Sequence, residues 1–405
     1  MQLRSRPLVC LTASALLALT LTGCRPHDFP QYPANYREFA YVTNGASGTV
    51  SVVDVVNVRL DRELAVGLNP VAVAASPTRN EVYVVNAGTA NGQGPQGSQG
   101  WISIVNTENN SVAGSIAVHR QPLAIEVDPG GDLAYVANSG SNSVSVLDLK
   151  ARREIALIGT GEEPAAVKLS PDGKSLVVAN RRGNSASIID PAARPPAQSV
   201  RAVFAGCPGA GDIVILPDSS KAFVACSAGH QILSIALAHI SNQTSAKPDP
   251  LPTRPDRLEA LLDVGRSPVQ LALKPDGGEI FSLNALSDSI SEIITNTNDV
   301  TGATLMGDGP VRGLVTPDNA LIYVSNQRSQ EVTIYAIDDG RRRGAIRVGD
   351  GPTALALSTA GHLLLVADSR SNDLAVVRTA SRSLFTLLPT GRSPNAIAIK
   401  AFTQP

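Results

Sequence analysis

The 405-residue chain has few aromatic residues, few histidines and no excess of charge of either sign. Phe, Trp and Tyr make up 4% of it, and there are five histidines and four cysteines. The 34 basic and 35 acidic residues are intermixed, which argues against nucleic-acid binding, because a polyanion needs a concentrated basic face. We therefore expect no nucleic-acid partner.

The sequence also lacks the common catalytic and cofactor motifs. There is no Cys-x-x-Cys-His for covalent haem, no Gly-x-Ser-x-Gly elbow and no glycine-rich phosphate loop. The histidines show no His-x-x-x-His spacing, so no zinc site is expected; they are His27, His119, His230, His239 and His362. The sequence thus implies no cofactor and no metal, and it names no catalytic residue.

The N-terminus predicts export and lipid attachment. Two arginines precede an apolar run, which is too short for a comfortable membrane span and ends in Leu21-Thr22-Gly23-Cys24. Small residues before a cysteine resemble a bacterial lipobox, which implies removal of residues 1–23 and lipidation of Cys24. The alternative is an ordinary signal peptide in which Cys24 is incidental. Two or more acyl chains would anchor the protein stably.

The residues that follow Cys24 refine this expectation. Arg25 stands where an aspartate is associated with inner-membrane retention, so the outer membrane of a Gram-negative host is favoured, with the protein facing the periplasm or the cell surface. Residues 24–38, rich in proline, are interpreted as a tether, and residues 39–405 as a single domain. The lipid anchor is the only membrane contact expected.

One phrase of short alternating runs repeats from residue 39 onwards. Its second run ends in a Tyr-Val-x-Asn type tetrapeptide, whose last residues are Asn44, Asn86, Asn138, Asn180, Cys226, Asn284, Asn326 and Asp368. We expect each Asn to bond neighbouring backbone as in an Asx turn. A Gly-x-x-Pro turn or a remnant of it precedes each first run, at Pro70, Pro122, Pro164, Pro208, Pro268, Pro310, Pro352 and Pro394. The recurrent spacing of 42 residues predicts four-stranded propeller blades.

The ends of the chain are out of phase with this repeat. The chain begins on the second strand of a blade, at Phe39, and finishes on a first strand, Pro394–Lys400. We therefore predict an all-β propeller of four-stranded antiparallel blades in which the C-terminal strand completes the N-terminal blade and closes the ring. Eight blades are favoured, with seven as the alternative, and a monomer is expected.

The Tyr-Val-x-Asn tetrapeptides and the turn Ser170-Pro171-Asp172-Gly173 resemble those of the YVTN-repeat β-propellers, which occur in archaeal surface-layer and bacterial exported proteins. The resemblance covers residues 39–400. It implies the fold, and it connects the chain with lactonase-like propellers and with the propeller subunits of periplasmic amine dehydrogenases. Many of these relatives have seven blades, from which eight equivalent repeats would be a departure.

Two repeats are longer than the others. One surplus lies in Ala87–Gly100 and ends at the only tryptophan, Trp101; the other lies in Ser241–Asp263, where a helical turn is expected at residues 256–262. Loops that outgrow their repeat often carry binding function. The alternative for each is neutral drift of a solvated loop.

The loops between blades and the loops after each Tyr-Val-x-Asn are predicted to share one face, here called the funnel face. Its charges could orient a polar ligand or a protein loop, or they could form an ordinary solvated rim. The candidate binding residues are His119, Arg120, Glu162, Glu163, Arg181, Arg182, Arg266, Asp308, Arg328, Asp350 and Arg392, together with Trp101. His119, Arg120, Glu162 and Glu163 could also imitate the converging acidic, basic and His side chains of lactonase-like propellers.

Cys207 and Cys226 are the only cysteines outside the signal and anchor region. They fall at the same end of one hairpin in an oxidising compartment, which predicts a disulfide. A reactive redox pair is the alternative.

Taken together, these features predict a non-enzymatic cell-envelope lipoprotein whose propeller binds an envelope protein, or a polar ligand, at the funnel face. Two alternatives remain open at this stage. One is a lactonase-like hydrolase, and the other is an accessory propeller of a periplasmic electron-transfer enzyme.

Overall fold

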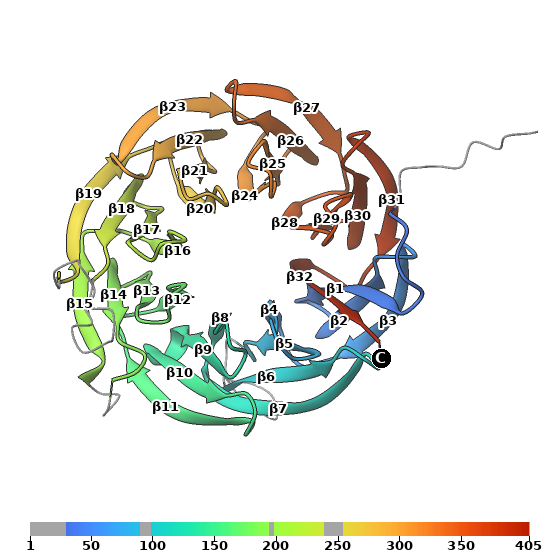
Figure 1. Cartoon of the computed structure of the whole chain (residues 1–405), viewed down its shortest axis with the longest axis horizontal. Helices are drawn as coiled ribbons and strands as arrows, with labels where there is room; N and C mark the ends of the chain where they lie inside the picture. Colours follow the sequence, from blue (N-terminus) through green and yellow to red (C-terminus); the bar gives the residue numbers. More distant parts are fainter. Residues whose placement is uncertain (1–29, 90–98, 194–197, 239–253, 405) are drawn as a thin grey trace, which may run out of the picture.

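The computed structural model describes residues 30–89, 99–193, 198–238 and 254–404. In these residues, eight four-stranded antiparallel sheets surround a central axis (Figure 1). The predicted propeller with eight blades is confirmed. The predicted lipidation site Cys24, the first part of the proposed tether (residues 24–29), and parts of both long insertions lie outside the described residues.

We number the blades from the N-terminus and name their strands from the channel outward. Blade 1 consists of β32 (Pro394–Thr403), β1 (Tyr36–Asn44), β2 (Thr49–Asp54) and β3 (Arg59–Ala65). Blade 2 consists of β4 (Pro70–Ala75), β5 (Glu81–Asn86), β6 (Gln99–Asn106) and β7 (Ser111–Arg120). Blade 3 consists of β8 (Pro122–Val127), β9 (Leu133–Asn138), β10 (Ser143–Asp148) and β11 (Arg153–Gly159), with one 3-10 turn, η1 (Ser139–Ser141). Blade 4 consists of β12 (Pro164–Leu169), β13 (Leu176–Asn180), β14 (Ser185–Ile189) and β15 (Val200–Ala205).

The second half of the ring repeats this order. Blade 5 consists of β16 (Ala210–Ile215), β17 (Lys221–Cys226), β18 (Gln231–Ala236) and β19 (Arg257–Asp263). Blade 6 consists of β20 (Pro268–Leu273), β21 (Glu279–Asn284), β22 (Ser289–Ile294) and β23 (Asp299–Leu305). Blade 7 consists of β24 (Pro310–Val315), β25 (Leu321–Asn326), β26 (Glu331–Ala336) and β27 (Arg341–Arg347). Blade 8 consists of β28 (Pro352–Leu357), β29 (Leu363–Asp368), β30 (Asp373–Arg378) and β31 (Ser383–Pro389).

Most innermost strands begin at the proline of the Gly-x-x-Pro turn. In seven of the described blades the first residue is proline, which lacks an N–H and is tolerated at the start of a strand. In blade 5 it is Ala210, two residues after Pro208, so the strand there does not begin at the expected proline. The residue just before the strand always has a left-handed backbone conformation; these residues are Asn69, Gln121, Glu163, Gly209, Ser267, Gly309, Gly351 and Ser393.

The core consists of eight apolar clusters, and each contains side chains of two neighbouring blades. The second and third strands are buried on both faces, which explains their nearly continuous apolar character. Tyr41, Tyr83 and Tyr323, the first residues of three Tyr-Val-x-Asn tetrapeptides, are among the largest fully buried side chains. The repeated tetrapeptide is therefore core packing between blades.

Blade 1 closes the ring as predicted. In Figure 1 the C-terminal strand β32 lies beside the N-terminal strand β1, and the two pair from Tyr36↔Thr403 to Thr43↔Ala396 before a bulge. Strand β1 thus begins at Tyr36, three residues before the expected start of the domain. Within it, fully buried Glu38 accepts a hydrogen bond from the backbone N–H of Thr359, 2.6 Å away in blade 8. The closing blade is also bonded to blade 2, where the ammonium of Lys400 on β32 donates to the carbonyl of Ser76 at 2.7 Å.

The asparagine that ends most second strands connects two strands of its blade. Its amide donates to a serine or threonine hydroxyl on the third strand, as from Asn138 to Ser145 and from Asn180 to Ser187, both at 2.9 Å. We expected local backbone bonding, which occurs only in addition, as from Asn86 to the carbonyl of Val84. Full burial explains the preference, because a buried amide needs several partners.

Blade 5 has a disulfide at the end of its second strand. In blades 1, 4, 6 and 7 a glycine three residues before the innermost strand packs on the asparagine; a Cβ on Gly161 would lie 2.7 Å from the side chain of Asn180. Cys207 and Cys226 occupy the corresponding positions, and their sulfurs are bonded with a Cα–Cα distance of 4.8 Å. Cys226 pairs with Ala210 across the hairpin, and a bulge follows. The predicted disulfide is confirmed.

The expected helical turn at residues 256–262 is wrong, because Arg257–Asp263 is strand β19. The leucines at 258, 261 and 262 have helical spacing, but the blade requires a fourth strand, and β19 supplies it by pairing with β18. The fold of the repeat overrides the local pattern.

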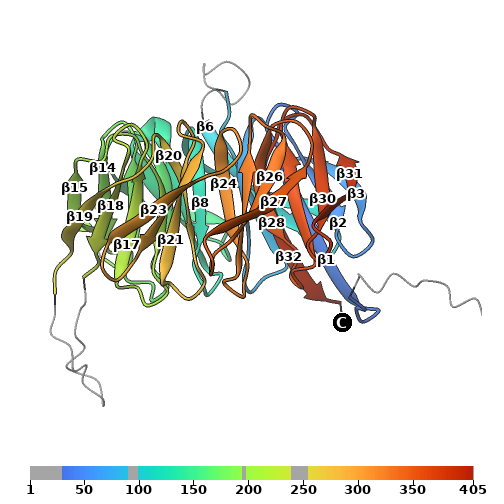
Figure 2. The same cartoon turned by 90° about the horizontal axis from the view of Figure 1, so that it is seen from above.

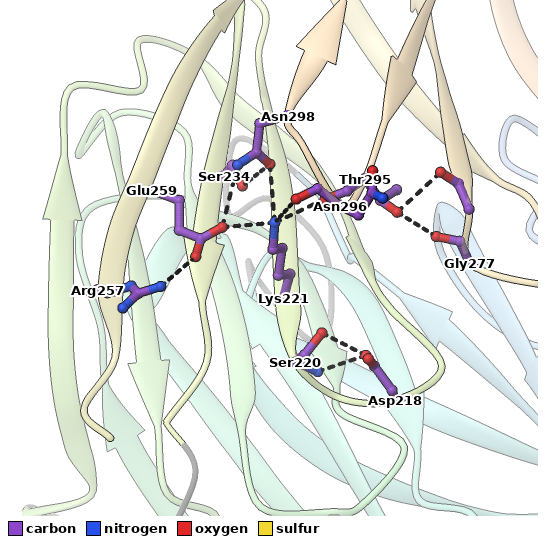
Figure 3. Close-up of polar contacts among 11 residues, drawn as sticks. Asp218, Ser220, Lys221, Ser234, Arg257, Glu259, Gly277, Thr295, Asn296 and Asn298 are labelled. Carbon is purple, nitrogen blue, oxygen red and sulfur yellow. Dashed lines mark hydrogen bonds and ion pairs between the residues drawn. The ribbon is translucent and has the colours of Figure 1, made fainter. Parts of the chain in front are cut away.

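A lysine joins blades 5 and 6 near these strands (Figure 3). The ammonium of Lys221 donates to the carbonyl of Thr295, at 2.9 Å, and lies 2.8 Å from the carboxylate of Glu259. Glu259 also holds Arg257 at 2.9 Å. The hydrogen bond from Lys221 lowers the pKa of Glu259 to about 2, against the effect of burial. Because these donors and acceptors satisfy one another, we interpret the cluster as structural.

Candidate functional site

The funnel face is formed by two sets of loops that bond to each other within each blade. The backbone N–H of Arg181, after β13, donates to the carbonyl of Glu163, just before β12, and Arg328 donates in the same way to Asp308. The innermost strands run away from this face, so the C-terminus, which follows β32, lies on the opposite face (Figure 2). The two loop sets therefore share one face.

Serine side chains fix the charged residues of the inter-blade turns. In five blades a serine hydroxyl of the loop after the second strand accepts a hydrogen bond from the backbone N–H of the charged residue, at 2.8–3.1 Å. The pairs are Arg120 with Ser141, Arg266 with Ser287, Asp308 with Ser329, Asp350 with Ser371 and Arg392 with Ser47. The backbone of each charged residue is thus held by a local bond.

The candidate acids of the inter-blade turns each pair with an arginine of the same blade. In blade 4, Arg181 lies 3.4 Å from Glu163 and Arg182 lies 3.8 Å from Glu162. In blade 8, Arg370 lies 2.9 Å from Asp350, and this hydrogen bond lowers the pKa of Asp350. The negative charges of the candidate acids in these two blades are thus neutralised by neighbouring arginines.

In blade 7 the arginine of the loop pairs with the acid of its own turn and also with an acid of blade 6. Arg328 lies 3.8 Å from Asp308 and 2.7 Å from Asp288, which follows the second strand of blade 6. Its guanidinium therefore connects two blades.

Three arginines of the funnel face do not form an ion pair with an acidic side chain among the described residues. Arg120, Arg266 and Arg392 begin the turns of blades 3, 6 and 1, and all three are exposed. No acidic side chain in the described part of the chain pairs with them, although Arg392 donates to the carbonyl of Ala46 at 3.1 Å. These three side chains give the face its unneutralised positive charge.

His119 is not brought together with the acids proposed to act with it. Its imidazole lies 3.4 Å from the carboxylate of Glu154, which is on β11, the outermost strand of blade 3. His119 itself is on β7, the outermost strand of blade 2. Because Glu162 and Glu163 are engaged by arginines, the structure does not assemble the lactonase-like arrangement considered above.

Trp101 packs at the junction of blades 1 and 2. Its indole N–H donates to the carbonyl of Val66 at 3.2 Å, and its ring covers Gly67, where a Cβ would lie 2.2 Å from the ring. A cleft of about 590 Å³ lies beside it and includes Leu68, whose side chain is 43% exposed. Trp101 therefore has a packing role and also lines a cleft, while residues 90–98 of the first insertion lie outside the described residues.

The channel contains charged residues that the sequence reasoning missed. The third residue of the innermost strand is Asp212, Gln270 and Arg312 in blades 5, 6 and 7, and alanine in the other described blades. Deeper in the channel, Lys168 forms an ion pair with Glu126 at 2.9 Å. Burial raises the pKa of Asp212, while the charges of Arg312 and Lys168 oppose that shift. Alignment of the repeats at this position is the signal that would have found these residues.

The described residues contain neither a metal-binding cluster nor a membrane-spanning helix. No group of three or more His, Cys, Asp or Glu side chains there is arranged to hold a metal ion. No helix in the same residues has the length and apolar character needed to cross a membrane.

Comparisons with known proteins support the fold. No protein-family model matches the chain, and no curated protein matches it significantly. Among solved structures, dihydro-haem d1 dehydrogenase NirN is similar with a TM-score of 0.66 and 15% identity, over 91% of this chain and 76% of that one. AztD from Citrobacter koseri is similar with a TM-score of 0.62 and 14% identity, over 90% of this chain and 98% of that one.

A third similar structure is a putative 6-phosphogluconolactonase from Bacteroides uniformis. Its TM-score is 0.57 and its identity 17%, over 80% of this chain and the whole of that one. At these identities the likenesses establish the β-propeller fold and nothing about a reaction or a ligand.

Proposed function

We propose that this protein is an exported, lipid-anchored binding propeller whose funnel face holds an acidic segment of another envelope protein. The observation that supports this proposal is the set of unmatched arginines, Arg120, Arg266 and Arg392. The candidate acids on the same face, Glu162, Glu163, Asp308 and Asp350, are each paired with an arginine of their own blade. The charge left for a partner is therefore positive.

The distribution of charge around the ring favours a localised anionic partner. Blades that begin their turn with an acid have an arginine in the following loop, whereas blades that begin with arginine have no basic residue there. The one acid in those loops, Asp288 of blade 6, pairs with Arg328 of blade 7. The unmatched arginines lie in blades 1, 3 and 6, separated by two, three and three blades. An acidic segment across the channel mouth could contact all three.

The overall charge does not explain this face. With residues 1–23 removed, two arginines are lost, and 34 − 2 = 32 basic residues remain against 35 acidic ones. The mature chain is thus slightly acidic, while its funnel face is basic, a separation that would steer an acidic partner to that face.

Apolar side chains beside the arginines could complete the contact. Leu286, next to the turn of Arg266, is 54% exposed, and Leu68 is 43% exposed beside Trp101. Buried apolar anchors surrounded by charge are typical of protein interfaces. The serine bonds that hold the turns would lower the ordering cost of binding.

The test is affinity purification of the tagged full-length lipoprotein from detergent-solubilised native membranes, followed by protein identification. One variant carries Arg120→Glu, Arg266→Glu and Arg392→Glu. The matched control carries Arg153→Glu, Arg341→Glu and Arg347→Glu, which are exposed on outermost strands and change the charge equally.

We expect a partner that copurifies with the unmodified protein and the control, is lost from the funnel-face variant, and dissociates as salt screens the charges. Retention of the partner by the funnel-face variant would contradict the proposal. If no partner is found and the purified protein turns over lactones, the hydrolase alternative replaces it.

A further inference from the structure

The third residue of each innermost strand distinguishes one sector of the channel from the rest. In blades 1, 2, 3, 4 and 8 this residue is alanine, at 396, 72, 124, 166 and 354. In the consecutive blades 5, 6 and 7 it is Asp212, Gln270 and Arg312. The alanines show that the fold itself needs only a small apolar side chain here, so the three polar residues require another explanation.

Two of the three polar side chains are used within the protein. The carboxylate of Asp212 accepts a hydrogen bond from the backbone N–H of Leu271 in blade 6, at 2.9 Å. The carbonyl oxygen of Gln270 accepts one from Gly313 in blade 7, at 2.8 Å. Each side chain thus bonds the exposed edge of the next innermost strand and is fixed in position.

The third side chain, Arg312, has no corresponding bond. It is exposed, and because it belongs to an innermost strand, its exposed atoms face the channel. No acceptor for its guanidinium occurs among the residues that the structure describes. Asp212 attracts it electrostatically, but the two do not form an ion pair. Two other cations of the innermost strands are engaged, Lys168 by Glu126 and Lys400 by the carbonyl of Ser76.

We propose that Arg312 binds a carboxylate group in the channel, in a site bordered by Asp212 and Gln270. The planar guanidinium presents paired N–H donors that match the two oxygens of a carboxylate. Glu126 neutralises Lys168, and Asp212 partly offsets the positive charge of Arg312. The channel wall is therefore suited to a ligand with a single negative charge and not to a dianion such as phosphate. Arg312 lies two residues inside the strand that starts at Pro310, just below the funnel face.

The carboxylate could belong to a free small molecule or to an acidic side chain at the channel mouth. The site itself does not depend on the proposed partner of the funnel face. Arg312→Ala is a suitable variant, because five blades carry alanine at this position and the substitution is therefore compatible with the fold. Arg341→Ala, on the outermost strand of the same blade, is the matched control.

The experiment is calorimetric titration of the full-length protein in detergent, at low salt, with acetate, propionate, inorganic phosphate and a hexapeptide of glutamates. Thermal melting of each variant checks its folding. We expect both monocarboxylates to bind the unmodified protein and the control, with affinity weakened by about tenfold or more in Arg312→Ala. Arg312→Lys should recover part of the affinity, because it keeps the charge and loses the paired donors.

The probes distinguish the sources of the carboxylate. A hexapeptide that binds more than about tenfold tighter than acetate, and loses that advantage in Arg312→Ala, identifies a protein segment; equal affinities identify a free carboxylate. Unchanged binding in Arg312→Ala, tighter binding of phosphate than of acetate, or no carboxylate binding at about 10 mM would overturn the proposal. The variant with Arg120, Arg266 and Arg392 reversed should still bind acetate, so the two proposals fail separately.

Discussion

Asp368 provides the sharpest test of how the blades are held together. It ends the second strand of blade 8, where six other blades carry asparagine, and it is fully buried. It accepts a hydrogen bond from the N–H of Gly349 at 3.0 Å and faces Asp373 on the next strand. Burial, followed by the hydrogen bond and charge of Asp373, raises the pKa of Asp368 to about 8.

The pH dependence of stability follows from this shift. The native state holds the proton more tightly than the unfolded state, in which the pKa is about 3.9. The contribution of Asp368 is therefore fully present below about pH 4, falls as the pH rises, and is constant above about pH 8. Between pH 6 and pH 9 the loss spans about two pKa units, or roughly 2 to 3 kcal/mol.

Asp368→Asn should remove this loss, because the asparagine amide donates a hydrogen bond at every pH. We expect the free energy of unfolding of Asp368→Asn, minus that of the unmodified protein, to increase by roughly 2 to 3 kcal/mol between pH 6 and pH 9. Urea unfolding followed by circular dichroism at each pH measures this difference.

The reverse substitution is the control. Asn326→Asp places a carboxyl at the same position of blade 7, opposite Glu331, and should introduce the same loss of stability with rising pH. If the stability difference between Asp368→Asn and the unmodified protein is the same at pH 6 and pH 9, the buried, protonated carboxyl is not present and the reasoning is wrong.

Three further predictions concern the ring. The disulfide closes a loop of 19 residues, so reduction should lower the stability by about 3 kcal/mol. The double variant Cys207→Gly, Cys226→Asn, which introduces the glycine–asparagine contact of blades 1, 4, 6 and 7, should be unaffected by reductant in urea unfolding. Glu259→Gln should be less stable than the unmodified protein by about 1 to 2 kcal/mol at pH 7, after allowance for solvent screening. This deficit should shrink in denaturant titrations as the pH falls from about 4 to about 2, because protonation of Glu259 then removes its attraction to Lys221. Deletion of residues 394–405 removes β32 and should give an open, protease-sensitive and associating ring by gel filtration, whereas deletion of the last two residues should not.

The sequence was sufficient to predict the architecture because the repeat is strict. Eight tetrapeptides of the Tyr-Val-x-Asn type, together with ends of the chain that were out of phase, predicted a closing strand, and β32 supplies it. The local pattern failed at residues 256–262, where leucines at helical spacing form β19. An outermost strand is half exposed, so its composition is weakly constrained, and pairing with β18 determines its structure.

The site was harder to predict, because loop and channel contacts depend on residues that are distant in sequence. The sequence indicated which charges share the funnel face, but not that Glu163 pairs with Arg181, or that Arg120 remains unmatched. Arg312 was overlooked, because it lies within an apolar strand and has nothing unusual about it until the repeats are aligned.

The near equivalence of the blades makes their differences informative. The residue that ends the second strand is an asparagine in six blades, a disulfide-bonded cysteine at Cys226 and an aspartate at Asp368. Asn326, Cys226 and Asp368 each join the second strand to the turn before the innermost strand of their blade. These exchanges preserve a structural contact, so they need no function. The exchange of alanine for Arg312 is of another kind, because the arginine makes no contact that the fold uses among the described residues. A residue that replaces a sufficient alanine, faces the channel and has no described partner is therefore better explained by a ligand than by stability.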